Sequence, residues 1–309
     1  MHIVLAGGTG FLGSHLVARL TAEGHRLTVL TRHPRKPEQV RWNPTGAPAG
    51  PPGAPRPTDA ADGWSQVLDD ADAVINLVGE PIAPKRWTPA RKAALHDSRV
   101  KTTRTLVEAM TRARRIPATL INASAVGIYG PHGDEPVTEA TPPGSDFLAA
   151  LGKAWEAEAM AAAPVARVVL LRTGLALDKG GGALSQMALP FYFMAGGPLG
   201  SGRQFMPWIH RDDWTEMVHW ALVTPAVTGP LNVTSPNPVT NREFARTLGT
   251  VLRRPSIMPA PAFALRIALG ELADALLTGQ RALPAKAESL AFRFRHPELE
   301  PALRAIYGR

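Results

Sequence analysis

The segment SAVGIYG, residues 124–130, contains a serine and a tyrosine that could take part in proton transfer. The hydroxyl of Ser124 can hydrogen-bond a reacting oxygen, and the phenol of Tyr129 can give or accept a proton. The apolar run at 119–123 is typical of a buried strand, which would place both hydroxyls at a strand end. We therefore take them as the candidate catalytic residues; the alternative is a turn in which both hydroxyls are structural.

The segment GGTGFLG, residues 7–13, has three glycines whose spacing suits a bound phosphate. The first permits a tight turn, the second lets the backbone approach a pyrophosphate, and the third allows a helix to pack closely on a strand. A strand at 2–6 and a helix at 11–23 flank the segment, so the positive end of the helix would face the anion. The predicted cofactor contacts here are Gly7, Thr9, Gly10, Phe11, Leu12 and Gly13.

The residues after the next predicted strand, 27–31, indicate which dinucleotide is bound. NAD sites carry an acidic residue about 20 positions after the glycines, where it binds the ribose 2′-hydroxyl. Here Arg32 begins the basic segment RHPRK instead. A guanidinium can bind a 2′-phosphate through charge-assisted hydrogen bonds worth about 1.5–3 kcal/mol. We therefore predict NADP, with NADPH preferred over NADH, unless Arg32 is only a solvated loop residue.

A second group of cofactor contacts is predicted at NLVGE, residues 76–80, where the strand 73–78 ends. The carboxyl ends of parallel strands line the ligand crevice of such sheets. Gly79 would let the dinucleotide pass close to the backbone, or it could simply form a turn out of the sheet. The residues assigned to this group are Leu77, Val78, Gly79 and Glu80.

The segment GSGRQFMPWIH, residues 200–210, carries polar and aromatic side chains that would suit an anionic or planar substrate; the alternative is a loop packed on the sheet domain. The capping-box spacing of Asp213 and Glu216 predicts the start of a helix at 213–223. Because capping explains Asp213 without a metal, we predict no metal site here. The residues assigned to the substrate pocket are Arg203, Gln204, Trp208 and His210.

The composition narrows the classes of function. The chain of 309 residues has no cysteine, which excludes disulfides, thiolate metal sites and cysteine nucleophiles. Its net charge of +8 suggests an anionic partner, but the basic groups, such as Arg99/Lys101/Arg104, have helical spacing typical of a solvated face and lack interleaved aromatic residues. The N-terminus lacks the pattern of a signal peptide, and no apolar span reaches membrane length. We therefore expect a cytoplasmic protein with no nucleic-acid or membrane partner.

Short apolar runs alternate with longer amphipathic stretches, a pattern typical of βαβ units and a parallel sheet. The predicted strands are 2–6, 27–31, 73–78, 119–123, 167–172 and 230–234. The predicted helices are 11–23, 89–114, 146–162, 183–194 and 213–223, followed by a tail with helices near 240–253, 261–278 and 298–307. Residues 43–57 are rich in proline and glycine and are predicted to form a surface loop.

The order of these motifs resembles that of a known superfamily. GGTGFLG, NLVGE, SAVGIYG and LRTG (171–174) recur in this order in extended short-chain dehydrogenases/reductases, the NAD(P)-dependent epimerase/dehydratase group. Three longer segments are similar to an atypical epimerase-like subfamily with an extra C-terminal segment of unassigned function: NLVGEPIAPKRW (76–87), GGPLGSGRQFMPWIHRDD (196–213) and GQRALPAKAESLAFRFRHPELEPAL (279–303).

The resemblance implies an α/β fold, a doubly wound parallel Rossmann sheet with a smaller, mostly helical C-terminal substrate lobe. The NADP-binding domain would span 1–174, with a strand and a helix returning at about 211–236. The lobe would combine 175–210 with 237–309, and the active site would lie in the crevice between them.

The resemblance also implies a Tyr-x-x-x-Lys pair on the helix after Ser124, where the ammonium lowers the pKa of the phenol. The helix reads DFLAALGKAWEAEA, residues 146–159, and contains no tyrosine. Aligned on Glu156, it has Leu148 at the tyrosine position and Gly152 at the lysine position. Either another group, such as Tyr129, His210 or Arg203, supplies the proton, or the protein binds NADP without turnover. The position of Tyr129 in the superfamily's tyrosine–glycine pair favours a structural role.

Three hypotheses follow. The first is an NADP-dependent oxidoreductase or epimerase that acts on an unidentified small molecule. The second is a non-catalytic NADP(H)-binding sensor or regulatory protein, with no small-molecule substrate, and the third is a basic scaffold for interactions. Whether the chain is an enzyme stays open, as does the alternative that Arg172, at a strand end, faces a ligand or pairs with a carboxylate. A homodimer is compatible with the sequence.

The cofactor assignment predicts the effect of replacing Arg32 by aspartate. The carboxylate would repel a 2′-phosphate, so the Arg32→Asp variant should lose affinity for NADPH by roughly tenfold to a hundredfold and bind NADH almost as before. Titration of each dinucleotide by fluorescence measures the two changes. Equal losses for NADPH and NADH would show that Arg32 does not read the 2′-phosphate.

Overall fold

The computed structural model describes residues 1–44, 63–83 and 85–308. The loop predicted at 43–57 lies almost entirely outside these residues. The centre of the fold is a sheet of seven strands in the order β11-β7-β5-β4-β1-β2-β3, with every neighbouring pair parallel. The strands are β1 (His2–Ala6), β2 (Arg26–Thr31), β3 (Gln39–Arg41), β4 (Ala73–Asn76), β5 (Thr119–Ala125), β7 (Arg167–Thr173) and β11 (Gly229–Val233).

This sheet confirms the predicted doubly wound architecture. The six predicted strands are all present. The structure adds the short, polar strand β3, which was not predicted because its sequence contains no apolar run. The chain moves from β1 to β2 and β3 on one side, then returns to β4 on the other side of β1. Such a reversal of strand order is where ligands bind in open α/β sheets, at the carboxyl ends of the strands.

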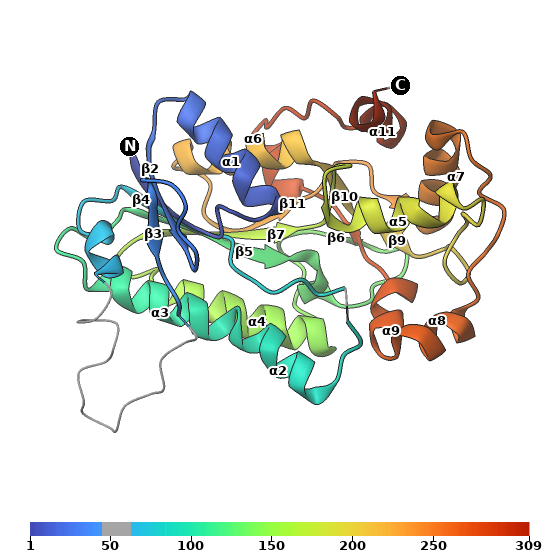
Figure 1. Ribbon diagram of the computed structural model, residues 1–309, viewed down its shortest axis with the longest axis horizontal. Helices are drawn as coiled ribbons and strands as arrows, with labels where there is room; N and C mark the ends of the chain where they lie inside the picture. Colours follow the sequence, from blue (N-terminus) through green and yellow to red (C-terminus); the bar gives the residue numbers. More distant parts are fainter. Residues whose placement is uncertain (45–62, 84, 309) are drawn as a thin grey trace.

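Helices cover both faces of the sheet (Figure 1). α1 (Phe11–Ala22) and α6 (Arg211–Val223) lie on one face, and α3 (Val100–Thr111) and α4 (Phe147–Met160) lie on the other. The alternation along β1 divides the core, because Ile3 and Leu5 pack with α1 and α6 whereas Val4 and Ala6 pack with α3 and α4. Burial on both faces explains why these strands are continuous apolar runs.

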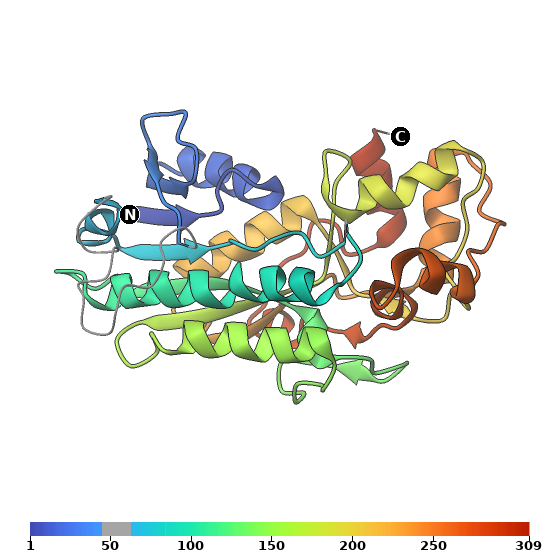
Figure 2. The same ribbon diagram turned by 60° about the horizontal axis from the view of Figure 1, so that its bottom comes forward.

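Most of the remaining elements form a lobe at one end of the sheet, as Figures 1 and 2 both show. Its core includes Trp208 and Phe244 and is mostly helical, as predicted. Its helices are α5 (Gly182–Tyr192), α7 (Asn241–Leu252), α8 (Ala262–Leu269), α9 (Leu272–Leu277) and α11 (Leu299–Tyr307). Its short strands pair as β8 (Leu175–Leu177) with β10 (Trp208–His210), and β9 (Phe205–Met206) with β12 (Val239–Thr240). The C-terminal segment returns to the sheet domain through β13 (Arg281–Ala282), which pairs with β6 (Pro136–Val137), and through α10 (Ala285–Ser289).

Two predicted helices are each broken in two. The helix predicted at 89–114 consists of α2 (Pro89–Asp97) and α3, because the Ser98 hydroxyl and the Arg99 guanidinium both donate to the carbonyl of Leu95 and end the first helix. The helix predicted at 261–278 consists of α8 and α9, separated at Gly270, whose φ of 61° lies outside the helical region. Among the described residues, no helix is long and apolar enough to cross a membrane.

The capping box predicted at Asp213 is wrong. Helix α6 begins at Arg211, and the ring Nδ1 of His210 accepts from the backbone N–H of Asp212. Asp213 is 1% exposed, and its carboxylate accepts the backbone N–H groups of Arg295 and His296, each at 2.8 Å. Asp213 therefore fastens the C-terminal segment onto α6. Burial raises the pKa of this carboxyl group, and the two backbone donors oppose that effect.

Replacing Asp213 by alanine should loosen this attachment. The backbone N–H groups of Arg295 and His296 would lose their charged acceptor, which should lower the free energy of unfolding by about 2–4 kcal/mol. Chemical denaturation followed by circular dichroism measures the loss. Asp212→Ala, which changes the more exposed neighbouring carboxylate, is the matched control and should have a much smaller effect. Equal losses in the two variants would contradict the role of Asp213.

Candidate cofactor and substrate site

The glycine-rich segment forms a tight turn between β1 and α1. Gly7 has a φ of 85°, and the N–H of Gly10 donates to its carbonyl at 3.1 Å. A Cβ atom at Gly13 would lie 2.2 Å from the same carbonyl, and one at Gly7 would lie 2.9 Å from the carbonyl carbon of Leu77. The turn therefore requires glycine, and it packs directly against the end of β4. The glycine turn at 7–13 and the NLVGE segment at 76–80 are far apart in the sequence, but they are in contact in the structure.

The N-terminus of α1 is open to a ligand. Its N-cap is Gly10, no side chain caps it, and its first turn contains no acidic residue. Thr9 and Gly10 are exposed. Uncapped amides at the positive end of a helix are what a pyrophosphate needs. The turn and the helix therefore fit the diphosphate of a dinucleotide.

Phe11 and Leu12 contribute to this site through their backbone rather than their side chains. The ring of Phe11 lies against Gly181 and Gly182, where a Cβ atom would come within 2.8 Å of it. Leu12 packs against the core beneath α1. Both side chains thus anchor helix α1, and only the backbone N–H groups of these two residues are available to bind an anion.

The predicted reader of the ribose phosphate, Arg32, is exposed directly after β2. The carboxylate of Glu80 lies near it and pairs with Arg91 at 2.6 Å. The hydrogen bond from Arg91 holds the pKa of Glu80 below its usual range, and the charge of Arg32 contributes a smaller part. The structure therefore brings Arg32 and Glu80 to the same edge, with the acid already neutralised by a second arginine.

The residues after β4 rest on a buried arginine that sequence reasoning missed. Gly79 is exposed, and a Cβ atom on it would lie 3.1 Å from the guanidinium of Arg99. Arg99 donates to the carbonyls of Glu80 and Leu95 and lies 5.1 Å from the ring centroid of Trp155. Burial lowers its pKa to about 10, so it stays cationic at neutral pH. Its helical spacing suggested a solvated face, and only the packing of α3 under β4 places it inside.

The two candidate catalytic hydroxyls belong to one buried hydrogen-bond network. Ser124 donates to Glu156 at 2.6 Å, and Glu156 forms a two-pronged ion pair with Arg172 at 2.8 and 2.9 Å. Arg172 also donates to the phenol oxygen of Tyr129 at 3.0 Å, and that phenol donates to Asn232 at 2.7 Å. This pairing confirms the alternative in which Arg172 meets a carboxylate.

The geometry favours a structural role for Tyr129. The residue is 0% exposed, and its phenol already gives one hydrogen bond and accepts another. Burial raises the pKa of the phenol, which opposes proton release at neutral pH. Ser124 is also buried, with its proton directed to Glu156. Both hydroxyls therefore donate to partners inside the protein, Glu156 and Asn232.

The positions that the resemblance assigns to the Tyr and Lys, Leu148 and Gly152, are packed against Gly127 and Ile128, just after β5. In the short 3₁₀ helix η2 (Val126–Tyr129), an added Cβ at Gly127 would lie 3.4 Å from the Cβ of Leu148, which is ordinary van der Waals contact. A Cβ at Gly152 would lie 3.0 Å from Ile128. Helix α4 therefore packs closely on η2 at Gly152, and a lysine there would require the side chain of Ile128 to shift. The departure from the family pattern is built into the packing of this helix.

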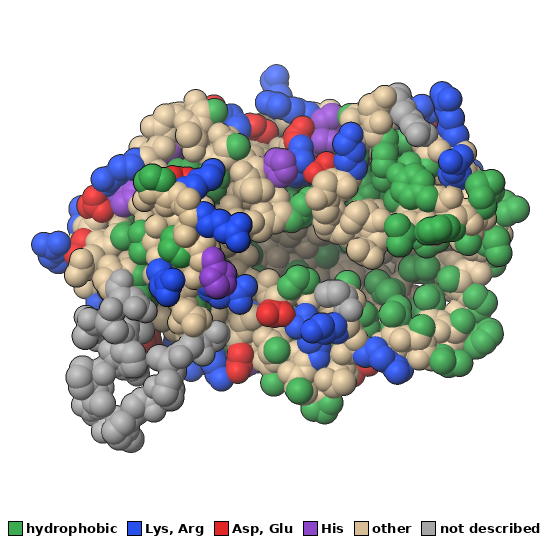
Figure 3. Space-filling view, viewed as in Figure 1, with side chains coloured by type: hydrophobic (Ala, Val, Ile, Leu, Met, Phe, Trp, Pro, Cys, Tyr) green, Lys and Arg blue, Asp and Glu red, His purple; other side chains and the backbone are tan. Residues whose placement is uncertain are grey.

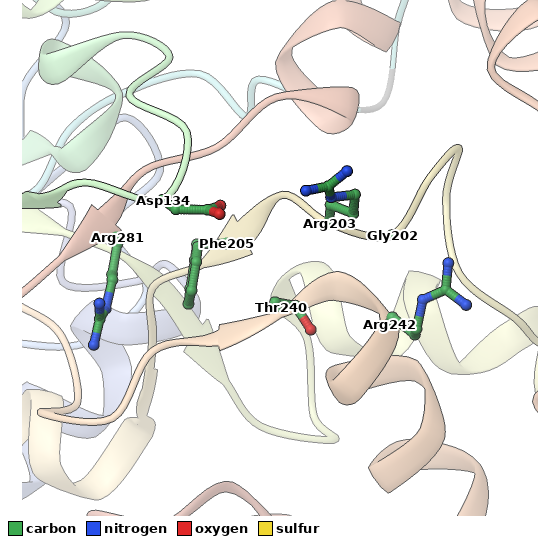
Figure 4. Close-up of a pocket in the computed structure, with 7 residues that line it drawn as sticks. All are labelled: Asp134, Gly202, Arg203, Phe205, Thr240, Arg242 and Arg281. Atoms are coloured by element: carbon green, nitrogen blue, oxygen red, sulfur yellow. The ribbon is translucent and has the colours of Figure 1, made fainter.

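Of the predicted pocket residues, Arg203 lines a cavity of about 470 Å³ (Figure 4). Gln204 instead donates to the carbonyls of Leu199 and Leu276. Trp208 is 0% exposed and donates to the carbonyl of Asn237, and His210 is buried at the start of α6. The structure therefore does not bring these four residues together in one pocket. The remaining lining residues are Asp134, Gly202, Phe205, Thr240, Arg242 and Arg281.

His210, Asp212 and His296 form a group whose ligand atoms lie within 4.8 Å of one another. The rings of His210 and His296 are stacked, with centroids 3.9 Å apart and planes 29° from parallel. In-plane lone pairs of stacked rings do not converge on one ion, and the Nδ1 of His210 already accepts a backbone N–H. Burial and then the charge of His296 lower the pKa of His210 to about 4. The cluster is suited to packing the C-terminal segment on α6.

The lobe presents an apolar surface beside the hollow between it and the sheet domain (Figure 3). Phe193, after α5, is 76% exposed, and Ile257, before α8, is 81% exposed. The two segments are joined, because the N–H of Met258 donates to the carbonyl of Gly196. Other exposed members of this surface are Leu189, Tyr192, Met194, Met258, Phe263 and Ile267.

Removing the phenol oxygen of Tyr129 tests whether the residue is structural. The Tyr129→Phe variant should lose about 1–3 kcal/mol of unfolding free energy, because Asn232 and Arg172 lose a buried partner. Its affinity for a dinucleotide should be unchanged. Urea denaturation and dinucleotide titration measure the two quantities, with Tyr192→Phe, which alters an exposed phenol, as the control. Wild-type stability in Tyr129→Phe would argue against the structural role.

Comparisons with known proteins show the family of this chain. The model of the NAD dependent epimerase/dehydratase family matches residues 3–233, and a domain of unknown function, DUF1731, matches 260–306. The chain is 41% identical over 309 residues to the chloroplastic epimerase family protein SDR39U1 homolog of Arabidopsis thaliana, covering 99% of this chain and 86% of that protein. It is 40% identical to the epimerase family protein YfhF of Bacillus subtilis, covering 98% and 97%.

A crystal structure of the human epimerase family protein SDR39U1 (isoform 2) with NADPH superimposes with a TM-score of 0.87 at 33% identity, with 100% of each chain covered. The family match spans the glycine turn, the strand ends and the sheet that positions them. The chain belongs to the NAD dependent epimerase/dehydratase family and carries the additional C-terminal domain DUF1731.

Proposed function

We propose that this protein binds NADPH and acts as an NADP-dependent oxidoreductase or epimerase on a small molecule. The observation that carries the proposal is the uncapped N-terminus of α1 over its glycine turn, followed by Arg32 where an NAD site would have an acid. The human relative with bound NADPH supports the choice of cofactor.

Each part of the crevice edge would hold one part of the dinucleotide. The amides at the start of α1 would neutralise the diphosphate, and Arg32 would pair with the 2′-phosphate. Gly79 would let the dinucleotide cross the end of β4 closely, with Arg99 beneath it as a buried positive charge. The bound cofactor would supply or accept a hydride at the crevice. The apolar surface of the lobe would favour a substrate with an apolar part.

A second candidate function is NADPH binding without turnover, as a sensor or regulatory protein. The observation that favours it is the loss of a side chain for proton transfer, since Leu148 and Gly152 stand where the family pattern has tyrosine and lysine. Both phenol and serine hydroxyl of SAVGIYG are committed to the buried network. In the enzymatic alternative, the proton would come from water or from the substrate.

The proposal also covers the cellular location and the partners of the protein. A small-molecule substrate in the cytoplasm, with no nucleic-acid or membrane partner, agrees with the scattered basic residues. A homodimer is compatible with these assignments.

Two measurements on the same preparation test the proposal and separate the candidates. NADPH should raise the melting temperature and change the cofactor fluorescence, whereas NADH should do so only at much higher concentration. Oxidation of bound NADPH in the presence of a panel of aldehydes and ketones would support the enzyme. Binding with no oxidation by any carbonyl compound would reject a reductase and leave the sensor or an epimerase, which shows no net oxidation of its cofactor. If NADPH produced neither the thermal nor the fluorescence change, both candidates would be rejected.

A further inference from the structure

Helix α8 is apolar along its whole length but is not part of any core. Seven of its eight residues, AFALRIAL, are apolar, yet no residue of this helix, all of which is described, is buried. Phe263 and Ile267 lie one turn apart on the same face, and each is more than two-thirds exposed. A helix this short gains its stability from packing of an apolar face rather than from its own hydrogen bonds. The exposed face of α8 is therefore typical of a helix that a further surface covers.

The apolar surface of the lobe continues from α8 onto two other segments. The N–H of Met258 donates to the carbonyl of Gly196 at 3.0 Å, so the chain before α8 runs beside the chain after α5. A Cβ atom at Gly197 would overlap the carbonyl oxygen of Met258, which shows how closely the two segments approach. The exposed apolar residues at 189–194, at 257–258 and in α8 therefore belong to one surface, which Figure 3 shows on the lobe.

The backbone holds part of this surface in a strained conformation. Met194 has a φ of 61°, in the left-handed region that residues other than glycine rarely adopt. The turn is fixed by hydrogen bonds from the N–H of Met194 to the carbonyl of Phe191 and from the N–H of Ala195 to that of Pro190. It leaves Phe193 and Met194 exposed, although both side chains are large and apolar. Strain of this kind is concentrated at functional sites, which supports a binding role for the surface.

The size of this surface fits a protein partner. With roughly 100 Å² exposed for each side chain, its eight members present about 800 Å² of apolar area. The largest apolar patch on a typical monomer is about 300–600 Å². A standard protein–protein interface buries about 800 Å² on each partner, so the apolar surface alone is large enough for one. A small-molecule substrate in the neighbouring hollow would cover only part of it.

The charges at this surface suit a second copy of the chain. Arg266, between the exposed residues of α8, pairs with Asp274 at 3.0 Å. Glu271, which follows α8, pairs with Lys92 at 2.5 Å. Each of these charges is balanced within its own chain. Two copies related by a twofold axis would therefore not bring unbalanced like charges together at α8 and α9.

The outer face of α3 and α4 is less suited to contact between copies. It exposes Lys101, Arg104 and Lys153. The guanidinium of Arg104 pairs with Glu158 on the neighbouring helix. Lysine and glutamate are depleted in the centre of protein interfaces, where apolar side chains predominate. The apolar surface of the lobe is therefore the better candidate.

We propose that the apolar surface of the lobe is the interface of a homodimer, in which two copies bind through the same surface about a twofold axis. An apolar surface whose charges are paired is compatible with its own copy, as such a contact requires. The dimer would bury the exposed face of α8 and the turn at Phe193 and Met194. The glycine turn and Arg32 belong to the sheet domain, so the interface is independent of the proposed binding of NADPH.

Sedimentation velocity over a range of protein concentrations tests the proposal. The wild-type protein should have twice the chain mass of 33.0 kDa. The double variant Phe193→Asp/Phe263→Asp places carboxylates in the apolar interface, so its dimer dissociation constant should be at least about a hundredfold higher. Both residues are exposed, so the variant should keep its melting temperature and its thermal shift with NADPH. Met160→Asp/Val165→Asp, which changes exposed apolar residues at and after the end of α4, is the matched control and should remain dimeric.

The absence of cysteine from the sequence allows the interface to be located directly. Met194→Cys, Ile257→Cys and Phe263→Cys each introduce a single thiol into the surface. Treatment with a short bis-maleimide should produce a covalent dimer in at least one of the three, because residues near a twofold axis lie close to their own copies. Met160→Cys, at the end of α4, is the control and should stay monomeric on a denaturing gel.

Wild-type protein that is monomeric at every concentration would overturn the proposal. So would a dimer that persists unchanged in Phe193→Asp/Phe263→Asp, or one that is cross-linked only through Met160→Cys. The exposed Arg253 and Arg254, shortly before Ile257, make an anionic membrane the other occupant to be tested. Monomeric protein that sediments with vesicles of anionic phospholipid would reject the homodimer and identify that occupant.

Discussion

The ion pair between Glu156 and Arg172 is the interaction on which this part of the molecule depends. It joins α4 to β7 inside the protein, where an unpaired charge would cost several kcal/mol. Ser124 and Tyr129 supply the additional hydrogen bonds that such a pair needs, from β5 and from η2. Loss of either charge would leave the other buried and alone, so the position of α4 on the sheet is tied to this pair.

The same network reaches the C-terminal segment. Asn232, which accepts from Tyr129, donates to the carbonyl of Leu283, and its own N–H donates to Glu139. Glu139 also accepts from the N–H of Lys286. Together with Asp213 on the opposite face, these bonds fix the C-terminal domain to the sheet at two places. The hydroxyls of SAVGIYG are therefore members of a buried hydrogen-bond network, which favours a structural role for them.

The polar groups left free lie elsewhere. The amides at the start of α1 are uncapped, and Arg32, Arg203 and Arg281 are exposed without carboxylate partners in the described part of the chain. Exposed donors of this kind suit anionic ligands, whereas the buried donors of Ser124, Tyr129 and Arg172 are engaged within the protein. The chain therefore has the features that bind the dinucleotide in its family, the glycine turn and the uncapped start of α1, although Leu148 and Gly152 replace the Tyr and Lys that would transfer a proton.

Much of this could be predicted from the sequence, because it depends on local pattern. The apolar runs of β1, β4, β5 and β7 and the spacing of Gly7, Gly10 and Gly13 are short-range features, and the structure has the strands and the turn where they were expected. The absence of Tyr-x-x-x-Lys is likewise readable from the residues alone. Other features depend on contacts between distant segments, for which a single sequence carries no signal. The carboxylate of Asp213 binds the backbone of Arg295 and His296 instead of capping a helix, and Arg99 is buried because α3 packs beneath Gly79. Local propensity determined the sheet and the cofactor turn, and tertiary packing decided which polar side chains are structural and which stay free to bind.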